Sequence, residues 1–139
     1  LLRNQTDIGN AVKPFYGKAA GNRLTVLLNR HINGVVAILS AAVAGHAKAQ
    51  GRAIAAEEAN AKAIGDFLAA ANPTNWPKAA MERMMHLHIG QTLVYATDQL
   101  QGHYAASIRE YDKAELHMSR MGNMLAAGII AQFPGRFTG

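Results

Sequence analysis

Three histidines lie on apolar faces of expected helices, and their side chains are the ones in this chain best suited to chemistry. His88 lies in "ERMMHLHIGQT" (82–92), among methionines and leucine, His31 follows "LLNR", and His117 lies in "AELHMSRM". A histidine in an apolar environment costs free energy unless its ring nitrogens find partners. Those partners can be hydrogen-bonding groups or a metal ion.

Two interpretations of these histidines stay open. In the first, each imidazole hydrogen-bonds a buried Asp, Asn, Thr or carbonyl group and only fixes the register of the helices. In the second, imidazoles and a carboxylate converge on one transition-metal ion, as helical bundles often arrange. Such ligands suit copper, iron, manganese or zinc without choosing among them. The candidate ligands are His31, His88, His117 and Asp7, and the candidate neighbours of these ligands are Asp112, Asn4, Asn60 and Met121.

Distances along the chain predict which candidates face each other. His88 and His117 lie about equally far from the turn that joins their helices, so adjacent antiparallel helices should place them at one height. Asp7 and His31 are roughly matched in the same way across an earlier turn. Residues 46–53, expected to form a small-residue loop, decide whether the two pairs share one level.

Methionines flank His88 and His117 and bear on the choice of metal. Thioether and imidazole ligands together favour copper, particularly Cu(I), whereas methionine is also a flexible filler of hydrophobic cores. The absence of cysteine excludes disulfides, thiolate metal sites and c-type haem attachment. The chain also lacks the phosphate-loop spacing of nucleotide-binding proteins and the E-x-x-H motif of standard ferritin-like di-iron centres. The flanking methionines are Met84, Met85, Met118, Met121 and Met124.

Acidic residues add a third hypothesis, an enzyme. Asp112 and Glu115 precede His117 closely enough for either to orient its ring, and a histidine so oriented can act as a general base. Glu57 and Glu58 are expected to form an exposed acidic pair that complements a helix dipole.

Composition predicts a single helical domain over residues 1–139. Half of the residues are hydrophobic and only 6% are aromatic, a mixture that favours helices over sheets. The net charge of +5 comes from scattered single basic residues, which is atypical of nucleic-acid binding. The longest apolar run, "GVVAILSAAVAG" (34–45), is shorter than the ~20 residues that a membrane span needs.

Proline, glycine and apolar spacing predict the helices. Short connections make neighbours antiparallel, so the expected fold is an all-α, up-down bundle of four long helices preceded by a short N-terminal helix. That first helix looks short for its partners, and we expect further sequence before it. The predicted helices cover residues 1–13, 19 or 22 to 44, 53–71, 77–101 and 104–132.

Several motifs resemble a bacterial family of small helical-bundle proteins, some of them exported. The motifs are "LLRNQTDIGNA", "HI", "HIGQT" and "QFP", and the resemblance extends over nearly the whole chain. It implies a helical bundle with a further helical segment before "LLRN", and it brings no reaction. The family usually has tryptophan where this chain has Glu57. The polar positions that match the family are Asn4, Asp7, Asn10, His31, His88, Asp112 and His117.

The leading hypothesis is therefore a metal-binding bundle, with copper, iron or zinc held in its core. The alternative is a structural or interaction protein with a polar network and no metal, which could form homo-oligomers. The resemblance to exported proteins favours an extracytoplasmic location.

Overall fold

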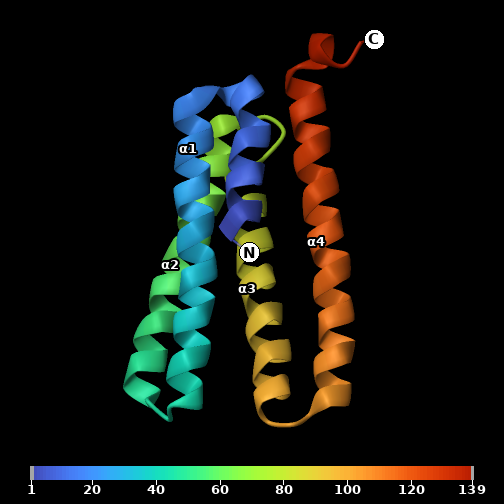
Figure 1. Ribbon diagram of the computed structural model, residues 1–139. Coiled ribbons are helices and arrows are strands. Elements are labelled where there is room, and N and C mark those ends of the chain that lie inside the picture. Colours follow the sequence, from blue (N-terminus) through green and yellow to red (C-terminus); the bar gives the residue numbers. More distant parts are fainter. Residues whose placement is uncertain (1, 139) are drawn as a thin grey trace.

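The computed structural model describes residues 2–138 and consists of four long helices and a short 3-10 helix (Figure 1). Each long helix packs on the next one along the chain, and α1 also contacts α3. This arrangement confirms the predicted all-α, up-down antiparallel bundle. In chain order the elements are α1 (Leu2–Val43), α2 (Ala47–Ala71), α3 (Lys78–Leu100), α4 (Tyr104–Gln132) and η1 (Pro134–Arg136).

The first long helix consists of two arms that fold back on each other. The break lies at Gly17, whose φ of 86° and ψ of 165° belong to a conformation that suits glycine. The arms lie side by side in Figure 1, and their backbones touch at Gly9 and Gly21. A Cβ atom on Gly9 would lie 2.7 Å from the carbonyl oxygen of Gly21. Glycine at these positions therefore allows the close approach of the two arms.

The prediction of a loop over residues 46–53 was wrong, because α2 begins at Ala47. Alanine is the strongest helix former, so this alanine-rich stretch continues as helix despite Gly51. Only residues 44–46 connect the two helices, with Gly45 at a φ of 70°. The tight turn makes α1 and α2 direct antiparallel neighbours, which sets the height of α2 side chains against those of α1.

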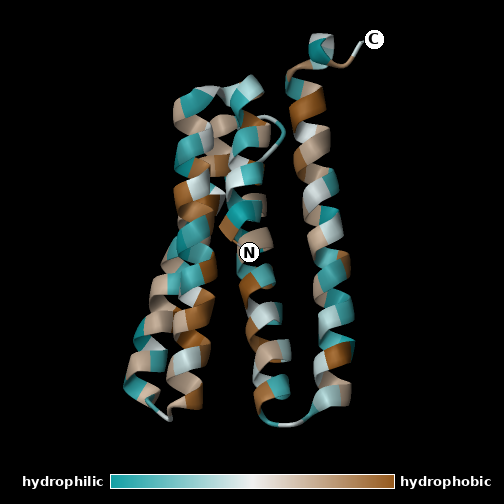
Figure 2. Ribbon diagram, in the orientation of Figure 1, coloured by the Kyte–Doolittle hydropathy of each residue, from teal (hydrophilic) through white to brown (hydrophobic). Residues whose placement is uncertain are grey.

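The hydrophobic core runs along the helix contacts, and Figure 2 shows hydrophobic residues interleaved with hydrophilic ones along every helix. Its centre includes Leu27, Ile64 and Met81. Near the C-terminal end of α4, the ring of Trp76 lies against Gly128, where a Cβ atom would come within 2.7 Å of the ring atom Cε2. The side-chain amide of Asn72 donates a hydrogen bond to the carbonyl oxygen of Gly128, at 2.8 Å. These contacts tie the loop after α2 to α4.

Among residues 2–138, α1 is the one helix that is long and apolar enough to cross a membrane, judged by length and composition. The longest apolar run in the sequence had suggested that no stretch is long enough to span a membrane, whereas α1 meets this test because the apolar residues 34–43 form the last part of a long helix. A core helix of a soluble protein and a signal sequence meet the same test. The extracytoplasmic location stays a prediction.

Candidate functional site

The three histidines expected to matter lie in one row across the bundle. His31 from α1, His88 from α3 and His117 from α4 follow one another, and His88 occupies the middle position. The ring centroids are 5.4 Å apart for His31 and His88 and 6.3 Å apart for His88 and His117. His31 is buried, with 7% of its surface exposed, and the other two are half-buried. We call these three residues the histidine row.

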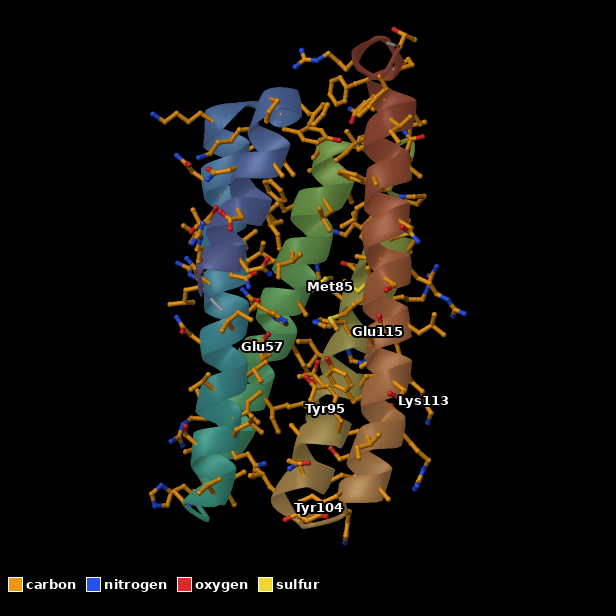
Figure 3. All side chains as sticks on the ribbon, turned by 45° about the vertical axis from the view of Figure 1, so that its right-hand side comes forward. Glu57, Met85, Tyr95, Tyr104, Lys113 and Glu115 are labelled. Carbon is orange, nitrogen blue, oxygen red and sulfur yellow. The ribbon has the colours of Figure 1, made fainter. Side chains whose placement is uncertain are left out.

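A carboxylate from α2 joins the histidine row at the end formed by α1. Glu57 is 1% exposed, and its Oε1 atom pairs with Nδ1 of His31. Its other oxygen occupies the space that a Cβ atom on Gly34 would fill, and the carboxyl carbon would lie 2.9 Å from that atom. Figure 3 shows Glu57 where α1 and α2 run side by side, and Met85 between α3 and α4. Glycine at position 34 therefore makes room for this carboxylate.

The expectation that Glu57 is an exposed partner of Glu58 was wrong for Glu57 and correct for Glu58, which is exposed. Glu57 lies four residues before Ala61 and seven before Ile64, so it belongs to the buried stripe of α2. It also lies about as far after the turn at Gly45 as Gly34 lies before it. This spacing is the signal that could have found Glu57, but the expected loop over residues 46–53 concealed it.

The groups that face the two outer rings determine which nitrogen of each ring carries the proton in its neutral form. The ionised carboxylate of Glu57 can only accept, so a neutral His31 ring beside it carries its proton on Nδ1 and keeps the lone pair on Nε2. The Nε2 atom of His117 lies 3.1 Å from the carbonyl oxygen of Met84, which also only accepts. In His117 the lone pair is therefore on Nδ1. Each ring at an end of the row has one nitrogen held by an acceptor and one free to accept.

The central ring has a buried nitrogen with no hydrogen-bond partner. Among residues 2–138, none bonds to Nδ1 of His88. The pKa of His88 is lowered to about 4, mainly by burial and in smaller part by the neighbouring His31 and His117. A positive charge on this ring would be shielded from water and would lie between two other imidazoles, so the neutral form is favoured. His88 is therefore neutral near pH 7, with a lone pair available.

The nitrogens of the histidine row do not converge on one point, so the row does not form a coordination shell for a metal ion. Within the described part of the chain, no group of three or more histidine, cysteine, aspartate or glutamate side chains is arranged to hold a metal ion. The rings are inclined by 32° and 30° to their neighbours, so they lie closer to a stack than to the edge-on arrangement in which nitrogens converge. What the structure brings together is a buried carboxylate and three neighbouring imidazoles.

Two acidic residues expected near the histidines lie on the surface instead. Asp7 is 62% exposed at its side chain and pairs with Arg3 at 3.8 Å. Asp112 is also exposed, and the ring of His117 contacts the carbonyl group of Met84 in place of this carboxylate. Both side chains are exposed because sequence position fixes the height of a residue on a helix better than the direction of its side chain, and their role beside the histidines stays a prediction.

The other three candidate neighbours of the ligands, Asn4, Asn60 and Met121, lie on the surface or serve helix packing. Asn4 is exposed. Asn60 donates a hydrogen bond to the carbonyl oxygen of Leu27 at 3.2 Å, which ties α2 to α1. Met121 is half-buried and packs against the core that contains Met84 and Met85. Of the methionines that flank the row, Met84, Met85, Met121 and Met124 belong to the hydrophobic core, whereas Met118 is exposed.

Comparison with protein-family models, with curated proteins and with solved structures finds no match for this chain. The structure supports only the general part of the resemblance, a small all-helical four-helix bundle. The histidine row and Glu57 are therefore the features of this chain that bear on its function.

Proposed function

We propose that this bundle binds a transition-metal ion through the histidine row, with Glu57 as the carboxylate of the site. The observation that carries the proposal is the buried Nδ1 atom of His88, which has no hydrogen-bond partner among residues 2–138. It lies between two rings that each retain one lone pair. A buried polar atom of this kind costs about 1–3 kcal/mol unless something satisfies it, and a cation would do so.

The spacing of the rings supports the proposal. A metal ion lies about 2.0–2.1 Å from an imidazole nitrogen, which places it about 3.2 Å from the centre of that ring. Two rings that share an ion then have centroids about 5–6.5 Å apart. The separations of 5.4 and 6.3 Å in the row fall in this range. Each neighbouring pair of rings can therefore share an ion if the rings turn, without the helices moving apart.

The charges of the site also suit a cation. His88 stays neutral near pH 7 because burial holds its pKa near 4, so no proton has to leave this ring before it coordinates. Glu57 would neutralise part of the charge of the ion. Imidazole and carboxylate suit copper, iron or zinc, so all three ions belong in the test.

The test is metal binding by protein purified without an affinity tag. Elemental analysis should find up to one equivalent of metal, and calorimetric titration of chelator-treated protein with Zn²⁺, Cu²⁺ and Fe²⁺ should detect one site for at least one ion. The variant His88→Leu should lose this binding, while His86→Leu, at an exposed position two residues away, should keep it. No uptake of any of the three ions by the folded wild type would refute the proposal.

A second candidate function, an interaction protein, is favoured by the outer face of α4. Tyr104, Ile108 and Tyr111 follow one another at helical spacing and are 60%, 62% and 49% exposed. Exposed apolar stripes of this kind often mark protein–protein contacts. Sedimentation equilibrium tests it: a concentration-dependent dimer that Ile108→Asp abolishes would support self-association, and a monomer at all concentrations would contradict it.

A further inference from the structure

We infer that Glu57 is a positioning residue that decides which nitrogen of His31 is offered to the histidine row, and that Nε2 is the ligand atom of His31. The inference deepens the proposed metal site and rests on it for its functional meaning. Its structural content, the proton position on His31, holds with or without metal.

The side chain of Glu57 is held in one place by its surroundings. Its side chain is 1% exposed, and one carboxylate oxygen fills the space beside Gly34 while the other faces Nδ1 of His31. A carboxylate has no hydrogen to donate, so an ionised Glu57 can hold a neutral His31 ring only through a proton on Nδ1. A neutral histidine side chain in water prefers the opposite form, with the proton on Nε2. Glu57 therefore selects the less common form of His31.

This selection has a consequence for coordination. With its proton on Nδ1, the ring of His31 can bind an ion only through Nε2. A carboxylate that accepts from the other nitrogen of a metal-bound histidine orients the ring and raises the basicity of the ligand. The carboxylate also leaves a negative charge near the bound ion, which favours a cation over a neutral or anionic ligand.

His117 has the complementary arrangement. Its Nε2 atom donates to the carbonyl oxygen of Met84 at 3.1 Å, so its ligand atom is Nδ1. The backbone carbonyl that holds it does not change when Glu57 is substituted. His117 therefore provides an internal reference in every variant of Glu57.

The experiment is long-range ¹H–¹⁵N NMR of histidine side chains in chelator-treated protein near pH 7.5, which identifies the protonated nitrogen of each ring. Wild type should show His31 protonated at Nδ1 and His117 at Nε2. Glu57→Gln keeps an amide oxygen that can accept from Nδ1 and should keep the wild-type pattern. Glu57→Leu removes the acceptor and should shift His31 to the Nε2–H form. Glu58→Leu, at the exposed neighbouring position, is the matched control and should change neither ring.

The outcomes separate this inference from the proposed function. A wild-type spectrum with His31 protonated at Nε2 would overturn the inference even if the protein binds metal, and this reading does not depend on whether Glu57→Leu folds. The expected pattern in a protein that takes up no metal would retain the positioning role of Glu57 and refute the metal site alone. If both hold, Glu57→Leu should also bind metal at least ten-fold more weakly than wild type, the lower end of the effect of losing such a partner.

Discussion

The central histidine predicts a stability that depends on pH. The pKa of His88 is lowered to about 4, first by burial and then by the neighbouring rings of His31 and His117, whereas an unfolded chain titrates its histidines near 6.5. Between these pH values His88 binds a proton in the unfolded chain but not in the folded chain. The free energy of unfolding therefore rises with pH in this window. The contribution is complete above pH 6.5 and is lost as the pH falls to about 4.

The size of this effect follows from the shift. The difference of about 2.5 pH units corresponds to about 3 kcal/mol, at 1.36 kcal/mol per unit. This is a large share of the 5–15 kcal/mol that typically stabilises a domain. Other ionisable groups also contribute to the pH dependence of the whole protein. The contribution of His88 must therefore be isolated by substitution.

The assay is urea denaturation followed by circular dichroism, on chelator-treated protein at several pH values from 4 to 7.5. The difference in unfolding free energy between wild type and His88→Leu should grow by about 3 kcal/mol in favour of wild type as the pH rises. His86→Leu should run parallel to wild type, because His86 is exposed. The half-buried Asp66, whose pKa is lowered to about 2 by hydrogen bonds from Lys62 and Lys78, titrates below this window. Parallel curves for wild type and His88→Leu would refute the reasoning.

Two close contacts of glycine yield further predictions that share one control. Gly34→Ala should lower the free energy of unfolding by about 3 kcal/mol, because the new methyl group would displace the buried carboxylate of Glu57. Gly128→Ala should cost about 2 kcal/mol and shift the fluorescence of Trp76, whose ring lies in the space the methyl group would take. Gly51→Ala, with nothing within 4 Å of the new atom, should instead stabilise the helix by about 0.5–1 kcal/mol. Urea denaturation measures all three, and equal effects at all three positions would contradict the packing argument.

The fold could be predicted from the sequence because residues at the ends of the helices mark where each helix begins and ends. Pro77, Gly102 and the apolar spacing locate α3 and α4 to within a residue or two. The matched heights of His88 and His117 follow from the rise of a helix alone, and the structure places these rings 6.3 Å apart.

The site was harder to predict than the fold because it depends on directions and on a close backbone approach. Asp7 matched His31 in height and yet lies on the outside of its arm. Glu57 resembled an ordinary surface acid, and only its position opposite Gly34 reveals that a carboxylate fits there. Such a fit depends on the distance between two helices, which no local pattern encodes.

The pair of Glu57 and His31 offers a test of whether this core is built for stability or for binding. A buried polar pair often stabilises a protein less than apolar residues of similar volume, by about 1–4 kcal/mol, while removing one partner alone costs about 3–5 kcal/mol. The double variant His31→Leu/Glu57→Leu should therefore match or exceed wild type in unfolding free energy, and Glu57→Leu alone should fall below both. The same double variant should bind no metal, since it lacks both the ligand and its partner. A double variant less stable than either single variant would mean that the pair serves the fold, and a double variant that still binds metal would remove it from the site.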